Sequence, residues 1–549
     1  MLISKKISDV KKQRYVEEGK SKEEGFIESF SVFFESVIKK PIYFLPISIL
    51  SLIAYLPSLT NTKRQFEDFH VDYYFGSGMQ TLSGRWGMYL WANLMGNAGN
   101  DILNKFFGVC FLMAASIMIS AVFYYLTDHR TCIMKYTVLS STVCTFPLLN
   151  EIWSYNIANS LVGLNLFIIS FSVYFLLTSN LELVKRVIII SFPFVFVSSS
   201  YESGLFAYIT LACVILFYRL LNNKICLIEC VKFGTVFAIP LIVGIIIGYL
   251  IGKINTIIWG LSYHRHGATT LQWGESNALK IMLAQNFEHY FLRGLVYLPI
   301  LVFDIAVGVF FLMICFYVFK KRWDVVLGAI VVFISIFILS VYQGSFLPYR
   351  TAQSVTVFTG FVFFLLMEMS ERWKKHIRIA ITTILIILCV EQSAYLEKIN
   401  LIDYQNAHND EDLMRQIGYE LTTDYYGKPV LFVGHIYDGY TLYSGEIMKN
   451  ITIDANTWNG ELYNRLIDKL NIERKNDKLF DSNMWSVIFL AVAEESSMEQ
   501  FFSYCGYSID VLSNANIAGE YPEVQKMIDN EELHTLQYID MGDYVVVGL

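Results

Sequence analysis

The chain has 549 residues, of which 54% are hydrophobic and only 17% are charged, whereas soluble domains usually carry about 25% charged residues. This composition excludes a single water-soluble core. The net charge is −7, but residues 392–549 carry −16 from 26 acidic and 10 basic side chains, and no Lys/Arg-rich stripe points to nucleic acid as a partner.

The chain begins with a charged segment that precedes any apolar run. Residues 1–41 lack the apolar stretch of a cleavable signal peptide, so we expect a solvated cytoplasmic arm there. Apolar runs that approach or exceed the roughly 17–25 residues of a membrane-spanning helix then recur up to residue 391. They predict eleven spans, at residues 42–58, 102–126, 133–149, 157–178, 187–200, 204–221, 233–251, 294–318, 325–342, 352–369 and 379–391.

Basic residues between the predicted spans set the expected orientation. With the N-terminus inside, all five short inner connections carry Lys or Arg, as the positive-inside rule requires. These residues are Arg130, Lys135, Lys185, Arg186, Arg219, Lys224, Lys232, Lys320, Lys321, Arg322, Arg372, Lys374, Lys375 and Arg378. An odd number of spans places residues 392–549 outside. The predicted fold class is a polytopic α-helical membrane protein, with a transmembrane domain at 42–391 and an extracytoplasmic domain at 392–549.

Two of the predicted outer connections are long, at residues 59–101 and 252–293. Outer loops of this length are often functional. The first contains GRWGMYLWANLMG, in which Trp86, Tyr89 and Trp91 suit a helix lying at the membrane surface. A plain interfacial anchor is the competing interpretation of these aromatic residues.

The region after residue 391 alternates helical and strand-like patterns, which predicts an α/β domain. Helical signals are NDEDLMRQIGYELTT and residues 498–505 and 521–531, and strand signals are PVLFVGHI, WSVIFLAV and YVVVGL. Only Cys505 lies in this region, so no disulfide framework is possible within it. Cys226 and Cys230 have helical spacing but supply too few ligands for structural zinc, and we expect no metal or cofactor.

The most informative stretch for chemistry is RQFEDFHVDYYFGSGMQTLSGRW, just outside the first span. It places Glu67, Asp68, His70, Asp72 and Arg85 within about one loop's reach of each other. Glycosyl transfer without a soluble nucleotide donor needs a carboxylate to accept the proton of the acceptor hydroxyl. Asp68 is the first candidate and Asp72 the second. An acidic solvated loop is the competing interpretation.

Further polar residues occur at the outer ends of other predicted spans, where a helical bundle would gather them. Ionisable residues at a membrane edge are functional candidates. They are Glu151, Glu202, His264, Arg265, His266, Arg293 and Arg350. A lone glutamate at a span end is more often a helix cap. Arg350 is the stronger candidate, because a leaving lipid phosphate needs fixed positive charge. His264 and His266 have no third metal ligand.

The order of these motifs resembles a known family over most of the chain. The motifs are Glu67-Asp68, Gly84-Arg85, Pro147 with Glu151 and Trp153, Tyr201-Glu202, Pro348 with Arg350, and EQSAYLEKINLIDYQNAHNDEDLMRQI before a Lys-Pro-Val strand. This order resembles that of the serotype-converting glucosyltransferases of phages and bacteria, membrane proteins of the GT-C type that modify O-antigen and related surface polymers. Glu67-Asp68 replaces the usual double aspartate, and Glu202 stands where that family would have glutamine.

The resemblance implies a polyprenyl-phosphate sugar donor, such as glucose, and a lipid-linked or growing surface glycan as the acceptor. It implies inverting displacement, with Asp68 as the base and Asp72 or Glu67 as substitutes, at the outer face of a bacterial inner membrane. The implied donor-phosphate residues are Arg350, Arg85 and Arg265, and the implied substrate-binding residues are Glu151, Trp153, Tyr201, Glu202 and His264. A flippase and a donor-synthesising transferase are the implied protein partners, and membrane lipids surround the spans.

Two other classes of protein fit parts of the pattern. A transporter or flippase for lipid-linked saccharide would also be polytopic, although such proteins often show two related halves, and the sequence shows no such pairing. A surface receptor that only binds glycans would leave the acidic loop dispensable. Transfer of a labelled sugar by the purified protein separates the enzyme from both.

Overall fold

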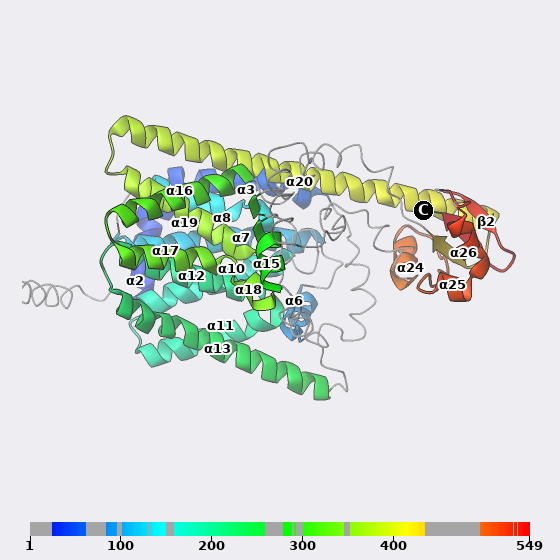
Figure 1. The fold of residues 1–549 in the computed structure, drawn as a ribbon, viewed down its shortest axis with the longest axis horizontal. Coiled ribbons are helices and arrows are strands. Elements are labelled where there is room, and N and C mark those ends of the chain that lie inside the picture. The colour runs from blue at the N-terminus through cyan, green and yellow to red at the C-terminus, as the bar shows by residue number, and fades with distance from the viewer. Residues whose placement is uncertain are drawn as a thin grey trace, which may run out of the picture.

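The computed structural model describes residues 25–61, 84–95, 101–129, 132–149, 159–258, 278–287, 290–291, 300–344, 352–433, 495–530, 532–534 and 536–548. A bundle of apolar helices makes up most of the described chain (Figure 1). One long helix leaves this bundle and leads to a small C-terminal sheet.

The bundle begins with helix α2 and a π-helical turn, Phe26–Phe33 and Phe34–Ile38. Its apolar helices are α3 Pro41–Thr60, α7 Asp101–Leu126, α8 Ile133–Cys144, α10 Asn159–Thr178, α11 Leu183–Ser200, α12 Ser203–Leu221, α13 Leu227–Ile258, α16 Ile300–Phe319, α17 Trp323–Ser335, α19 Gln353–Ser370 and α20 Lys375–Asp424. Shorter elements are α6 Trp86–Leu94, the 3₁₀ turn Pro147–Leu149, α15 Ala278–Phe287 and α18 Ile338–Gln343.

Each of the eleven predicted spans overlaps a described helix. Within the described residues, nine helices are long and apolar enough to cross a membrane. The apolar helices at Ile133–Leu149 and Trp323–Ser335 are shorter than this. The chain is therefore a polytopic helical protein, while the count of eleven spans stays a prediction.

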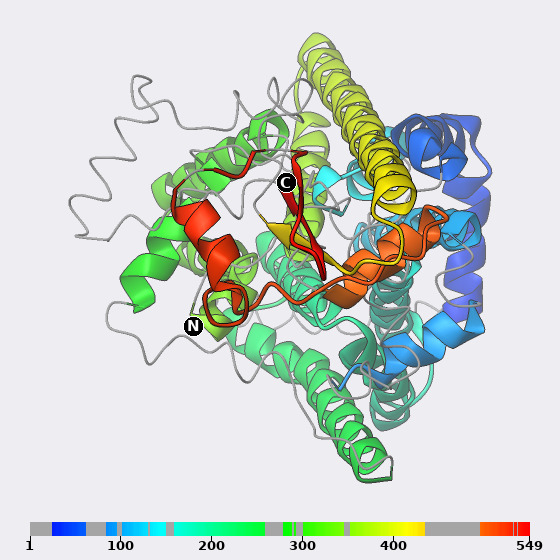
Figure 2. The same cartoon turned by 90° about the vertical axis from the view of Figure 1, so that its right-hand side faces the viewer.

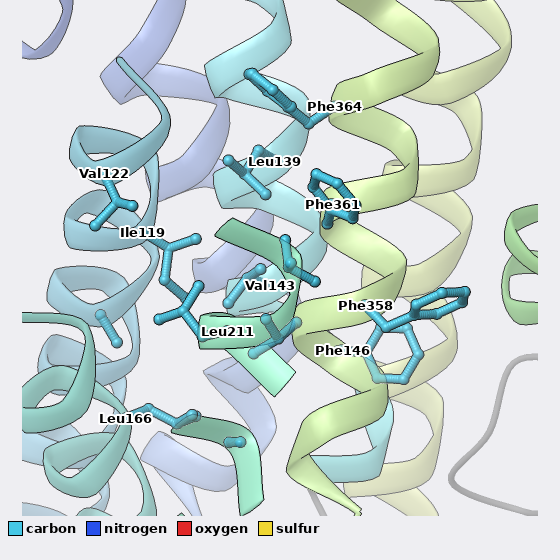
Figure 3. Close-up of a cluster of buried hydrophobic side chains, with 14 of the residues drawn as sticks. Ile119, Val122, Leu139, Val143, Phe146, Leu166, Leu211, Phe358, Phe361 and Phe364 are labelled. Carbon is cyan, nitrogen blue, oxygen red and sulfur yellow. The ribbon is translucent and has the colours of Figure 1, made fainter. Parts of the chain in front are cut away.

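The centre of the bundle is α19, with 83% of its apolar window buried, against 22% for α13 at the periphery. Figure 3 shows Phe358, Phe361 and Phe364 of α19 in one cluster with side chains of α7, α8, α10 and α12. Gly360 lets α19 approach α8, because a Cβ there would lie 2.8 Å from a methyl group of Val143. Dispersion contacts among these close-packed side chains favour the association of the helices.

Helix α13 packs against α11 through a stripe of small residues. A Cβ at Gly244 would collide with Phe194, and one at Gly248 would collide with Ser198. The Ser198 hydroxyl also donates a hydrogen bond to the Gly244 carbonyl at 3.2 Å. Small residues of this kind let two membrane helices approach closely, which compensates for the missing hydrophobic driving force in lipid.

The predicted span 325–342 is broken into α17 and α18 at Ile336. Side chains of neighbouring helices bond the carbonyls at the break. Thr210 donates to the Ser335 carbonyl at 3.1 Å, and Ser354 donates to the Ile336 carbonyl at 3.0 Å. Such bonds allow an irregular backbone inside a helical bundle, because the freed polar groups keep partners.

The two ends of the bundle differ, and we call them the arm end and the tail end. The arm end carries α2 and the turns around residues 129, 180, 223, 321 and 372. The tail end carries α6, α15, α18 and the turn between α11 and α12, and the C-terminal sheet lies beyond it (Figure 1). Most of the predicted inner basic residues that are described lie in or beside the arm-end turns, as the charge pattern predicts. Which end faces the cytoplasm stays a prediction.

Helix α20 runs without a break for 50 residues, from Lys375 to Asp424. The predicted boundary between span and tail, at 391–392, lies inside it. The helix contains no proline and no glycine before Gly418, so nothing in its sequence interrupts the helical hydrogen bonds. Gln392 and Asn400 fasten it to the bundle by bonds to the carbonyls of Thr142 and Ala54, both at 2.9 Å.

The described C-terminal strands form one sheet in the order β1-β3-β2. Strand β1 (Val430–Val433) is parallel to β3 (Val545–Gly548), which is antiparallel to β2 (Tyr538–Asp540). Helices α20 and α24 (Glu495–Tyr504) pack on one face, and α26 (Pro522–Asp529) covers the other. Figure 2 shows this sheet in front of the bundle.

The strands expected in PVLFVGHI and YVVVGL are thus present as β1 and β3, and the helices expected at 498–505 and 521–531 are present as α24 and α26. A further short helix, α25, spans Ile517–Glu520. The predicted strand WSVIFLAV lies outside the described residues.

Candidate functional site

Three of the predicted site residues, Arg85, Tyr201 and Glu202, fall within the described chain, and all three lie at the tail end. The others lie outside the described residues: Glu67, Asp68, Asp72, Glu151, Trp153, His264, Arg265, His266, Arg293 and Arg350. The structure therefore shows how the tail end positions the guanidinium of Arg85 and the turn that holds Tyr201 and Glu202.

Arg85 lies directly before α6, on a turn that requires glycine. Gly84 has φ +75°, in the left-handed region that L-residues with a Cβ adopt at a cost. The guanidinium carbon of Arg85 lies 5.6 Å from the centroid of the Tyr201 ring. This geometry is that of a cation–π contact. Two residues 116 positions apart in sequence, both predicted as site residues, are thus neighbours.

Helix α6 is held against the bundle by its own side chains. The Trp86 indole donates to the Gly248 carbonyl at 3.3 Å, and the Trp91 indole donates to the Ser160 hydroxyl at 2.8 Å. A Cβ at Gly87 would lie 2.5 Å from the Ser199 hydroxyl, so only glycine fits there. The predicted helix is present, and two of its aromatic residues bond to protein groups, while its position at the membrane surface stays a prediction. This attachment fixes the position of Arg85.

The turn between α11 and α12 is tied to two further helices. Asn165 of α10 donates to the Tyr201 carbonyl at 3.3 Å and accepts from the Ser200 hydroxyl at 3.1 Å. Gln353 of α19 donates to the Ser203 hydroxyl at 2.7 Å. A hydrogen-bonded path therefore runs from α19 through the turn to α10. These bonds hold in place the turn that carries the Tyr201 ring, over which Arg85 lies.

Glu202 occupies the N-cap position of α12 and is half-buried. Its side chain does not accept the hydrogen bond that would cap this helix. Glu202 therefore lies where a helix cap lies, without the hydrogen bond of one, and its negative charge next to the start of α12 suits the helix dipole. Its carboxylate lies one residue from Tyr201, and so belongs to the same turn as the ring that Arg85 covers.

A second cation, Lys105, lies near the start of α7 and is fully buried. Its ammonium lies 3.5 Å from the carbonyl of Asn61, the residue that follows α3. Asn61 and Gly84 flank the acidic stretch 62–83, and both belong to the tail end. Two fixed positive charges, Arg85 and Lys105, thus lie at the end of the bundle to which the carboxylate candidates are connected.

Three buried polar residues at the tail end were not predicted as site residues: Lys105, and the amides Asn159 and Gln353 at helix starts. Each is a polar residue at or near the edge of an apolar run. Such residues are costly in a membrane and are functional candidates for that reason. The signal was present in the sequence, but serine, threonine and asparagine residues elsewhere in the spans give the same signal.

The profile of the family described as Glucosyl transferase GtrII matches residues 56–367. The chain belongs to this family. The match begins inside α3 and ends inside α19, so it contains Arg85, the α11–α12 turn and the acidic stretch 62–83. Comparison with curated proteins and with solved structures gives no match. The resemblance inferred from motif order is therefore confirmed, and the family supports a glycosyltransferase activity.

Proposed function

We propose that the protein transfers glucose from a polyprenyl-phosphate donor to a cell-surface glycan, at the tail end of the bundle. The observation that carries this proposal is the fixed guanidinium of Arg85, held over Tyr201 at the tail end of the bundle and within the family-matched region. A lipid-linked donor reaches its enzyme from the bilayer, and its phosphate lies at the membrane edge. Preorganised cations at that edge stabilise the charge that develops on the departing phosphate.

The proposed reaction is a single displacement. The acceptor hydroxyl attacks the anomeric carbon of the glucose while the bond from that carbon to the phosphate oxygen breaks, which inverts the configuration. Asp68 takes the hydroxyl proton, with Asp72 or Glu67 as the alternative base. The electron pair of the broken bond leaves on polyprenyl phosphate, which Arg85, Arg350 and Arg265 neutralise.

The remaining predicted residues hold the sugars. Tyr201 and Glu202 come from the α11–α12 turn, and Glu151, Trp153 and His264 belong to other predicted outer connections, outside the described residues. The proposed location is the bacterial inner membrane, with the N-terminal arm in the cytoplasm and the C-terminal sheet outside. A donor-synthesising transferase and a flippase would supply the donor.

The first test of this proposal removes the base. Purified protein in detergent receives labelled polyprenyl-phosphate glucose and crude cell-surface glycan, and transfer is scored. Asp68→Asn keeps the shape of the side chain but cannot take a proton, so transfer should fall by about 10²–10⁴ at unchanged protein level. Asp72→Asn and Glu67→Gln are compared in parallel. Near-normal transfer by all three variants would remove the carboxylate assignment, and donor translocation without transfer would favour a flippase.

The second test removes the cation and has a matched control in the chain. Arg85→Ala should lower transfer by about 10-fold or more, because the phosphate loses a fixed charge. Arg219 at the arm end also lies over a ring, 5.2 Å from the centroid of Phe233. Arg219→Ala removes the same kind of contact far from the proposed site. Equal losses of transfer in both variants would show that Arg85 acts only through packing.

A further inference from the structure

Three buried amides of the described chain keep side-chain atoms without a hydrogen-bond partner: Asn159, Gln353 and Gln392, the last at its Oε1 only. Two of them, Asn159 and Gln353, begin helices at the tail end. Asn159 has no exposed surface, and neither its Oδ1 nor its Nδ2 atom has a partner. Gln353 is 1% exposed, and one end of its amide bonds to Ser203 while the other end has no partner. By contrast, Asn165 has partners at both ends of its amide.

An unpartnered buried amide costs free energy, because its donors and acceptor lose water and gain nothing. Natural proteins rarely keep such groups, and each one needs an explanation. An alanine or leucine at either position would remove the cost. The amides are therefore expected to have a partner in some state of the protein.

Both amides lie at the first residue of a helix that begins at the tail end. Asn159 begins α10, next to the Ser160 hydroxyl that receives the Trp91 indole of α6. Gln353 begins α19 and bonds to the turn whose Tyr201 ring lies under Arg85. Helix α6, which carries Arg85 at its start, therefore bonds to the residue next to Asn159. The turn that holds the Tyr201 ring under Arg85 is followed by Ser203, which bonds to Gln353. Both amides thus lie near the proposed site.

We propose that Asn159 and Gln353 bind hydroxyl groups of the transferred hexose. A primary amide offers two donors and an acceptor, and a sugar hydroxyl offers one donor and accepts as well, so the two groups complement each other. Neutral amides suit the neutral ring of the sugar, whereas Arg85 suits the phosphate. This inference rests on the proposed function and extends it to the recognition of the sugar.

Deoxy donors test this recognition directly. A site built to hydrogen-bond a hydroxyl rejects the analogue that lacks it by up to about 10⁴-fold, because its polar groups are then left unpaired. Wild-type protein should strongly disfavour at least one polyprenyl-phosphate deoxyglucose. Asn159→Leu or Gln353→Leu should lower transfer of glucose by 10-fold or more. The ratio of the transfer rate with the glucose donor to that with the deoxy donor should fall by a similar factor.

Stability separates this role from a structural one. Because the amide of Asn159 has no partner, Asn159→Leu should leave the melting temperature unchanged or raise it, while transfer falls. Asn165→Leu is the matched control on the same helix, and it should lower the melting temperature because it removes two bonds. Undiminished transfer in Asn159→Leu and Gln353→Leu, or a lowered melting temperature in both, would overturn the inference.

Binding of a sugar can be measured without transfer, from the shift in melting temperature. This measurement tests the sugar site separately from the proposed reaction. Methyl glucoside at saturating concentration should raise the melting temperature of the wild type, and this shift should be lost in Asn159→Leu and Gln353→Leu. If the wild type transferred no sugar but the glucoside shift depended on the amides, the proposed reaction would fail and the sugar site would stand. Equal shifts in wild type and variants, or none in the wild type, would refute the sugar site.

Discussion

Both ends of the helical bundle bury polar groups, but they treat them differently. At the arm end, the Tyr218 hydroxyl lies 2.8 and 2.9 Å from the two carboxylate oxygens of Glu368. Lys135, fully buried, lies 3.4 Å from Glu371. Its ammonium also lies 5.5 Å from the centroid of the Phe364 ring. A hydrogen bond to Glu368 thus joins α12 to α19, and an ion pair joins Lys135 of α8 to Glu371 at the end of α19, while Arg219 lies over the ring of Phe233.

At the tail end, the amides of Asn159 and Gln353 keep unpartnered atoms, and Arg85 is held on a turn by a ring rather than by a carboxylate contact within the described residues. The difference separates two uses of buried polarity. Paired groups at the arm end fix the packing of helices. The unpaired atoms of Asn159 and Gln353 cost stability, as expected of a site for a ligand, although the arm end also keeps an unpaired buried atom, Nε of Arg186.

The largest expected effect breaks the arm-end ion pair. Glu371→Ala leaves Lys135 buried without its carboxylate, which should cost about 3–5 kcal/mol of stability. Thermal unfolding in detergent measures the loss, and replacing both residues by Met and Leu should restore much of it. If the single variant were as stable as the wild type, the arm end would not depend on its paired charges, and the contrast between the ends would fail.

A smaller effect comes from the hydrogen bond to Glu368. Tyr218→Phe removes a donor to a buried carboxylate, so stability should fall by about 1.5–3 kcal/mol, while transfer per folded molecule stays at the wild-type level. Tyr208→Phe is the matched control, because its hydroxyl donates to the neutral carbonyl of Phe237 at 2.8 Å and should cost about 1 kcal/mol. Loss of transfer with retained stability in Tyr218→Phe would place catalytic function at the arm end.

The smallest effect concerns a water-facing ion pair in the C-terminal sheet. The stability lost when it is removed can be compared with the loss for the buried pairs. Lys428 lies 2.6 Å from Asp540 and lowers the pKa of that carboxyl. A lowered pKa in the folded state means that the pair stabilises above the unfolded pKa, about 4, and that this stabilisation is lost as pH falls through the folded pKa. Asp540→Asn should lower the melting temperature slightly at pH 7, and this difference should shrink as the pH falls below about 4. A difference that grows as the pH falls would contradict this sign.

Much of the bundle could be predicted from the sequence. Long apolar runs report directly on helices that avoid water, so each of the eleven predicted segments overlaps a described helix. The break between α17 and α18 could not be predicted, because residues 325–342 read as one apolar run and the bonds that allow the break come from Thr210 and Ser354 on other helices.

The candidate site was predicted in part. Arg85 and Tyr201 were named from motif order, and the structure places them in contact. Asn159 and Gln353 were missed, because a sequence does not show which buried polar residues lack a partner. Asn165 and Asn159 belong to the same apolar run, and only the packing of the α11–α12 turn against α10 distinguishes them.

The length of the unbroken helix α20 sets the distance between the membrane and the C-terminal sheet. Fifty residues of α-helix are about 75 Å long, and the hydrocarbon core of a bilayer takes about 30 Å of that length. Without a proline or glycine before Gly418, the helix has no hinge in the part that leaves the bundle. The distance of the sheet from the tail end is therefore set by residue count, at about 1.5 Å per residue, and its facing by about 100° per residue. Removing about seven residues would lower the sheet by two turns while nearly keeping its facing, whereas removing two would turn it away from the bundle axis.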